Sequence, residues 1–213
     1  MPAAGPSTPD RILGTALLLF NAHGERHVAT NRIADELGIS PGNLHYHFRT
    51  KEALISTLFK LYEKRMLELL AAPGPAVVHV EDIWLFLHLV FETIGEFRFL
   101  YRDLTDICSR FPGLRLRFQA ILKLSMATAR QLSQGLIDQD ELAATPEELD
   151  ALVRNIVLIS TFWIAFDQVA ERDGEPRPER AAWQVMSLIS PNLVGPARNE
   201  MKALAQAYRM QAD

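Results

Sequence analysis

The sequence predicts an all-α fold on three observations. Apolar residues recur at the three- and four-residue spacing of amphipathic helices along most of the 213-residue chain. We find no alternating apolar and polar run bounded by turn residues, and no Asn-Gly or Asp-Gly hairpin turn. Hydrophobic residues make up 48% of the chain and charged residues 23%, the balance of an ordinary globular protein with one large or two small domains.

The first helix is expected to follow a short N-terminal segment, residues 1–7, which is rich in Pro, Ala, Gly and Ser and predicted to be disordered. Thr8 is the candidate N-cap, because Pro9 and Asp10 then occupy the first turn, where both are favoured. Gly24 is expected to end this helix.

Two short helices joined by a tight turn are predicted next. Thr30 is the candidate N-cap of a helix over residues 31–37, which ends at Gly38. Ser40 caps a third helix that has Pro41 at its first position and runs to about residue 48. This geometry fits both an ordinary corner between helices and a helix-turn-helix that binds DNA.

The side chains of the third helix favour DNA. Leu44 and Phe48 are four residues apart and are expected to face inward. The outward positions then carry no carboxylate and are Gly42, Asn43, His45, Tyr46 and His47. Amides, imidazoles, hydroxyls and helix N-termini hold phosphates and read base edges. Lys51 lies in the first turn of the next helix, where it opposes the helix dipole, so a nearby phosphate would explain its position.

The net charge of −4 argues mildly against nucleic acid, but its distribution does not. Residues 8–65 hold eight Lys or Arg and six Asp or Glu, a net of +2, so the remainder carries −6. This polarity suits a DNA-binding head on an acidic body.

The stretch from Thr30 to Leu54 resembles the DNA-binding domain of the TetR family of transcriptional regulators, and the likeness extends over about residues 8–65. It implies a three-helix DNA-binding head with a helix-turn-helix (residues 8–72) and a larger helical ligand-binding and dimerisation domain (76–213). It also implies a homodimer, formed by helices at about 146–171 and 179–190, that binds a palindromic operator in double-stranded DNA. The expected function is a repressor released by a small apolar or amphipathic effector. A regulator without an inducer, or an activator, is the alternative.

The resemblance also implies which residues meet DNA. Thr30 and Lys51 would hold phosphates, Arg32 would reach a base or phosphate, and Asn43 would read adenine. The family usually has tyrosine at the position of His45, where an imidazole makes a shorter and pH-dependent contact. The full set of expected DNA-binding residues is Thr30, Asn31, Arg32, Ser40, Pro41, Gly42, Asn43, His45, Tyr46, His47 and Lys51.

The body begins after Pro73-Gly74-Pro75 and is predicted to contain helices at about 80–102, 104–110, 113–136, 146–171, 179–190 and 197–210. A capping box from Thr145 to Glu148 opens the fourth of these. Residues 155–166 are apolar on nearly all sides, so part of this helix is expected to meet a second subunit.

Aromatic and polar side chains within the apolar stretches of the body are the candidates for a ligand pocket, although each alone is more often a core residue. They are Trp84, His88, Phe91, Tyr101, Arg102, Phe118, Phe162, Trp163 and Phe166.

Several other classes of protein are disfavoured. The single cysteine, Cys108, excludes a disulfide within the chain and suits a reducing compartment. The N-terminus does not resemble a signal peptide, and the longest dense apolar run, residues 83–91, is too short to cross a membrane. We therefore expect a cytoplasmic protein without a membrane partner. No nucleotide loop, zinc spacing or nucleophile elbow is present, and His45 and His47 point apart on a helix, so we expect no enzyme activity, cofactor or metal.

Overall fold

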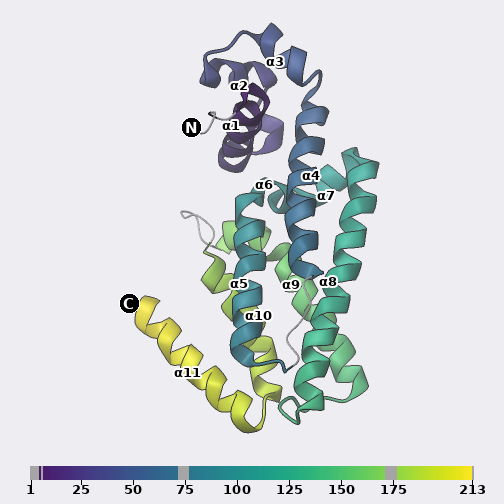
Figure 1. Cartoon of the computed structure of the whole chain (residues 1–213), viewed down its shortest axis with the longest axis vertical. Helices are drawn as coiled ribbons and strands as arrows, with labels where there is room; N and C mark the ends of the chain where they lie inside the picture. The colour runs from purple at the N-terminus through teal and green to yellow at the C-terminus, as the bar shows by residue number, and fades with distance from the viewer. Residues whose placement is uncertain (1–4, 6, 72–76, 171–176, 213) are drawn as a thin grey trace. The chain divides into compact units, whose positions relative to one another are not determined.

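The computed structural model describes residues 5, 7–71, 77–170 and 177–212, with the side chains of the last helix described as far as Gln206. Within these residues the regular structure is helical, apart from one isolated antiparallel bridge between Leu142 and Leu193 (Figure 1). The predicted all-α fold is confirmed.

The chain divides into two compact units. Unit 1 comprises Met1–Arg65 and Phe97–Arg115, and unit 2 comprises Met66–Glu96 and Leu116–Asp213. The sequence-based division drew its boundary at residues 73–75, outside the described residues, and so assigned 97–115 to the body. The structure groups this segment with the N-terminal helices instead.

The elements of unit 1 are α1 (Thr8–His23), the 3-10 turn η1 (Glu25–His27), α2 (Thr30–Leu37), α3 (Pro41–His47), α4 (Lys51–Leu70), α6 (Arg98–Arg102) and α7 (Leu104–Arg110). Those of unit 2 are α5 (Val80–Glu96), α8 (Pro112–Asp138), α9 (Pro146–Ala170), α10 (Pro178–Ile189), the 3-10 turn η2 (Ser190–Asn192) and α11 (Gly195–Ala212). The last turn of α4 belongs to unit 2 and the first turn of α8 to unit 1.

Three local predictions about helix boundaries were wrong. Ser7, not Thr8, caps α1, because its hydroxyl accepts the Asp10 N–H at 3.4 Å; the other residues of the segment predicted to be disordered, except Gly5, lie outside the described residues. Ala29, not Thr30, is the N-cap of α2. The predicted helix over 80–102 is divided into α5 and α6 at Phe97, whose backbone (φ −108°, ψ 35°) leaves the helical region.

Aromatic rings from separate helices form the core of unit 1. The Phe20 ring of α1 lies 5.4 Å from the Phe99 ring of α6, and the Tyr62 ring of α4 lies 5.8 Å from both Phe97 and Tyr101. The hydroxyls of Tyr62 and Tyr101 are hydrogen-bonded to each other, and both residues are buried. Buried polar groups in proteins are normally hydrogen-bonded, and this bond pairs two of them.

The end of α1 is held by α6 through polar contacts. The Arg102 guanidinium donates to the backbone oxygens of Phe20 (2.9 Å) and Asn21 (3.2 Å). In return, the Asn21 side-chain oxygen accepts the Phe99 N–H at 3.0 Å. The Phe20 carbonyl also accepts the Gly24 N–H at 2.9 Å, so Arg102 adds a second donor there and gives the Asn21 carbonyl a donor from outside the helix.

In unit 2, α10 packs against α5 and α9, and α11 packs against α5. The segment before α5 also lies close against α8: a Cβ atom built on Gly135 would lie 2.6 Å from a methyl carbon of Val78. The capping box at the start of α9 is confirmed, since the Thr145 N–H donates to the Glu148 carboxylate (2.7 Å) and the Glu148 N–H to the Thr145 hydroxyl (3.2 Å).

Among the described residues, α9 is the one helix long and apolar enough, by length and composition, to cross a membrane. Core helices of globular proteins meet the same criterion. In the structure 44% of its most apolar window is buried inside the chain, and one flank remains exposed at Leu158, Phe162, Phe166 and Val169.

Candidate nucleic-acid interface

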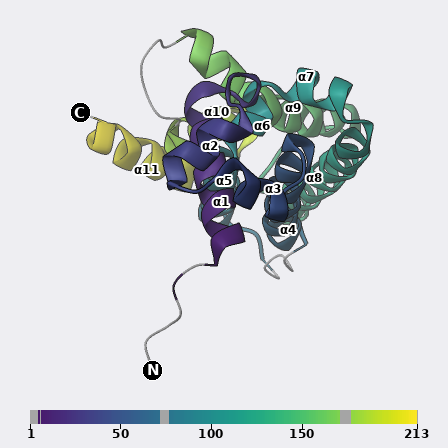
Figure 2. The ribbon, with the colours of Figure 1, turned by 90° about the horizontal axis from the view of Figure 1, so that it is seen from above.

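Helices α2 and α3 form the predicted helix-turn-helix and lie side by side (Figure 2). Gly38 ends α2 in the left-handed conformation (φ 65°), which allows the Ile39 N–H to bond back to the Ala34 carbonyl at 3.0 Å. The Ser40 hydroxyl then accepts the Asn43 N–H at 3.2 Å, and Pro41 occupies the first position of α3. Each of these contacts joins residues that are close in the sequence, which is why the sequence alone predicts the turn.

Helix α3 has a buried face and an exposed face. Leu44 and Phe48 are buried, as predicted. Pro41, Gly42, Asn43 and His45 are exposed, His47 is half-buried, and Tyr46 is 84% exposed. The exposed ring of Tyr46 lies edge-on to the His47 ring, with the ring centroids 5.1 Å apart.

The first turn of α2 contributes exposed polar side chains as well. Asn31 and Arg32 are exposed, while Thr30 is half-buried. The Arg32 guanidinium lies 2.8 Å from Nε2 of His23 on α1. Since arginine can only donate, Nε2 of His23 is the acceptor in this contact.

His45 makes a contact that a tyrosine would not make. Its Nδ1 lies 3.3 Å from the Arg49 backbone oxygen in the turn between α3 and α4. A carbonyl only accepts, so Nδ1 carries the proton, and Nε2 of the neutral ring is left as an acceptor. While Nδ1 makes this bond, Nε2 of a neutral ring accepts and cannot donate to a phosphate.

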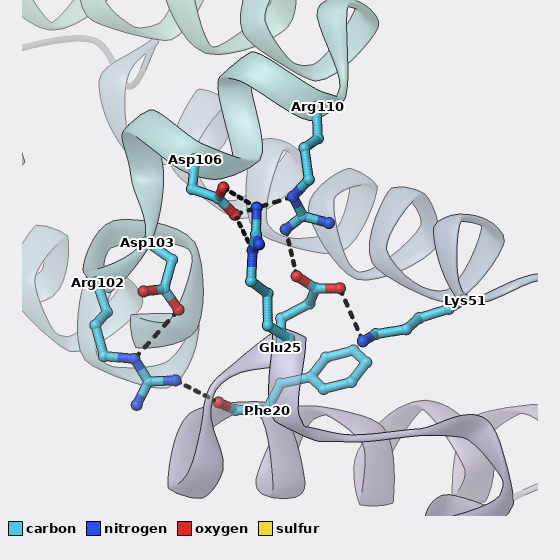
Figure 3. Close-up of polar contacts among 8 residues, drawn as sticks. Phe20, Glu25, Lys51, Arg102, Asp103, Asp106 and Arg110 are labelled. Carbon is cyan, nitrogen blue, oxygen red and sulfur yellow. Dashed lines mark hydrogen bonds and ion pairs between the residues drawn. The ribbon is translucent and has the colours of Figure 1, made fainter.

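Lys51 is placed against a buried carboxylate. Its Nζ lies 3.0 Å from Oε1 of Glu25, which is 2% exposed, and 5.9 Å from the centroid of the Phe20 ring. Glu25 also receives Arg110 from α7 (Figure 3). The negative charge that compensates Lys51 in this structure is therefore Glu25.

Asp106 extends this cluster. It bonds to Arg110 at 2.9 Å and to Arg26 of η1, and the Arg26 hydrogen bond lowers the pKa of the Asp106 carboxyl. The sequence did not reveal the roles of Glu25, Asp106 and Arg110, because Glu25 and Arg110 are 85 residues apart. A buried position for Glu25 directly after Gly24 leaves no periodic signal.

The residues predicted to bind a ligand are not all in the same unit. Tyr101 and Arg102 belong to unit 1, where they bond to Tyr62 and to the end of α1. Trp84, His88, Phe91 and Phe118 belong to unit 2, where Phe91 and Phe118 are buried. Two buried ring nitrogens in this unit, Nδ1 of His88 and Nε1 of Trp163, have no hydrogen-bond partner within the described part of the chain.

The three remaining ligand candidates line an apolar groove between α9 and α10. The groove has a volume of about 330 Å³ and is lined by Leu158, Ile159, Phe162, Trp163, Phe166 and Gln184. A second cavity of unit 2, about 30 Å³ in volume, is lined by α5, α8, α9 and α10, including Ile83, Leu87 and Ile156. It has room for about one water molecule.

Comparison with known proteins agrees with this architecture. The family described as "Bacterial regulatory proteins, tetR family" matches residues 12–58, and the family described as "Bacterial transcriptional repressor" matches residues 61–201. The HTH-type transcriptional regulator AcrR of Shigella flexneri is 25% identical over 206 residues, covering 91% of this chain and 95% of its own. UidR of Escherichia coli K12 is 27% identical over 168 residues, covering 77% and 83%.

A crystal structure shows the same architecture across almost the whole chain. A TetR-family transcriptional regulator from Marinobacter aquaeolei VT8 superimposes with a TM-score of 0.86 at 34% identity, over 95% of this chain and 99% of that one.

Proposed function

Because the chain belongs to the TetR family of transcriptional regulators, we propose that it is a cytoplasmic homodimeric repressor. In this proposal it binds a palindromic operator through α3 and releases it when a small apolar or amphipathic ligand binds unit 2. The observation that carries the DNA-binding part is the outer face of α3, where Asn43, His45 and Tyr46 are exposed and no carboxylate is present.

The operator can be identified directly. Selection of bound duplexes from a random pool by the purified protein, followed by sequencing, should yield an inverted repeat. Two copies of α3 would enter major grooves about 34 Å apart or a multiple of that distance. Recovery of random duplexes after repeated rounds would reject sequence-specific binding. A reporter placed behind the recovered site separates a repressor from an activator.

Asn43→Ala is expected to cost about 1–3 kcal/mol of operator affinity and to relax the preference at one base position. The exposed amide of Asn43 can bond both N6 and N7 of adenine in the major groove. Its backbone N–H, which donates to the Ser40 hydroxyl, is unchanged in the variant, so the helix should persist. Fluorescence anisotropy on the operator, on operators mutated at each position and on random duplex measures the effect. An equal loss on operator and random duplex would show that Asn43 reads no base.

The exposed flank of α9 supports a dimer. Phe162 and Phe166 are 42% and 62% exposed beside an apolar groove. A contiguous exposed apolar patch of this kind is typical of a surface that binds another protein. We expect Phe166→Asp to convert the dimer to a monomer in sedimentation velocity at micromolar concentration, because a charge in an apolar interface is costly. Val169→Asp, at an 85% exposed position on the same flank, should have the same effect. Leu18→Asp, at an exposed position on α1, is the control and should leave the dimer intact. A wild-type monomer would refute the dimer.

The buried ring nitrogens of His88 and Trp163 support a ligand site in unit 2, since a buried donor or acceptor without a partner is costly. A thermal-shift screen of apolar and amphipathic compounds should find a stabilising ligand, and that ligand should lower operator affinity in the anisotropy assay. A ligand that stabilises the protein without changing operator affinity is not an inducer. In that case binding of this ligand does not release the protein from its operator.

A further inference from the structure

We propose that Glu25 is a positioning residue for DNA binding: its carboxylate competes with a DNA phosphate for Lys51, and Arg110 sets how strongly it competes. The inference rests on the proposed function, in which Lys51 is a phosphate contact. It assigns a role to an acidic residue and to a residue of α7 that do not themselves face DNA in that proposal.

The geometry gives each oxygen of Glu25 its own cation. Oε1 lies 3.0 Å from Lys51, and Oε2 bonds to Arg110 (Figure 3). The Glu25 side chain is 2% exposed, whereas Lys51 and Arg110 are 28% and 29% exposed. A buried carboxylate is stable only when it is paired, so Glu25 depends on both cations.

Lys51 is the cation that DNA can reach. It is the first residue of α4, after the turn that follows the exposed face of α3, and its side chain is partly exposed to solvent. Its ammonium group has three donors. A phosphate that approaches Lys51 must therefore share it with Glu25, whose charge both attracts the lysine and repels the phosphate.

Arg110 determines how much of the Glu25 charge remains for Lys51. With Arg110 in place, one of the two carboxylate oxygens is bonded to a cation of α7. Without Arg110, Lys51 would be the one cation bonded to Glu25 among the described residues, and it would be held more firmly. Changes at α7 are thus transmitted to the DNA-binding face without any movement of α3.

The two substitutions should change DNA affinity in opposite directions. Glu25→Gln keeps the shape of the side chain and should raise the affinity for random-sequence duplex about fivefold at moderate salt, with a salt slope steeper by about one unit. Arg110→Gln should lower that affinity about fivefold and make the slope shallower. Fluorescence anisotropy of the full-length protein over a series of KCl concentrations measures both quantities.

Two controls isolate Lys51. Asp106→Asn is the matched acid-to-amide change in the same cluster, and it should alter affinity by less than about twofold because Asp106 does not touch Lys51. In a Lys51→Gln background, Glu25→Gln should lose its effect. If it raises affinity there as well, the effect is a general change in charge and the proposal is overturned.

Other outcomes are equally decisive. A folded Glu25→Gln protein, judged by far-UV circular dichroism, that binds DNA with unchanged or lower affinity overturns the proposal. If Glu25→Gln does not fold, the test rests on Arg110→Gln. An unchanged or raised DNA affinity of that variant contradicts the proposal. A wild-type protein that binds neither operator nor random duplex removes the proposed function itself, whereas normal wild-type binding with an inert Glu25→Gln removes this inference only.

Discussion

Replacing Arg102 with alanine is expected to lower the free energy of unfolding by about 3–5 kcal/mol. The Arg102 guanidinium donates charge-assisted hydrogen bonds to the Phe20 and Asn21 carbonyls, and its side chain is only 17% exposed. The substitution removes two charge-assisted hydrogen bonds between α1 and α6, although the Phe20 carbonyl keeps the Gly24 N–H and Asn21 keeps its bond to the Phe99 N–H.

Urea unfolding followed by far-UV circular dichroism measures this loss. The three tryptophans, Trp84, Trp163 and Trp183, all belong to unit 2, so their fluorescence reports that unit separately. Arg11→Ala is the matched control, since Arg11 is exposed on α1, and it should cost less than about 0.5 kcal/mol. A loss below about 1 kcal/mol for Arg102→Ala would mean that water replaces the guanidinium as the cap.

Tyr62→Phe is expected to lower the free energy of unfolding by about 2–3 kcal/mol, and Tyr101→Phe by a similar amount. Each single change removes one hydroxyl of a buried pair and leaves the other without its partner in the pair. The double variant removes both hydroxyls of the pair together, so its loss of stability should be well below the sum of the two single losses. Urea unfolding of all four proteins gives the coupling energy. Tyr46→Phe, at an 84% exposed position, is the control for the loss of a tyrosine hydroxyl as such.

The same pair predicts a loss of stability at alkaline pH. Burial raises the pKa of the Tyr62 hydroxyl well above its ordinary value of 10.0, and burial also raises the pKa of Tyr101. The folded protein therefore keeps both protons while the unfolded chain releases them. This stabilisation is complete below about pH 10 and declines as the pH rises further. Wild-type protein should lose stability more steeply than the double variant over that interval; equal slopes would exclude the pair as the cause.

The sequence predicted what is determined locally. The turn between α2 and α3 follows from Gly38, Ser40 and Pro41, each of which acts through its nearest neighbours. The capping box at Thr145 is equally local. The buried and exposed faces of α3 followed from the spacing of Leu44 and Phe48 alone.

Contacts between distant segments could not be predicted in this way. Arg102 was assigned to a ligand pocket because a polar side chain after an apolar run needs a partner, but its partners are carbonyls 81 and 82 residues earlier in the chain. Lys51 was explained by a phosphate because its position at a helix N-terminus is unfavourable; the sequence could not show that Glu25 folds against it. In both cases the chemistry required a partner, and only the fold identified it.

The close approach of α8 to the segment before α5 limits which sequences this fold can accept. At Gly135 even the smallest side chain would overlap the Val78 methyl group, 2.6 Å from the position of its Cβ. A Cβ atom built on Gly95 in α5 has no neighbour within 4 Å, so alanine fits at that position and favours the helix. Two glycines that look alike in the sequence thus differ in what can replace them: a Cβ atom has room at position 95, whereas at position 135 it requires Val78 to move or to be replaced as well.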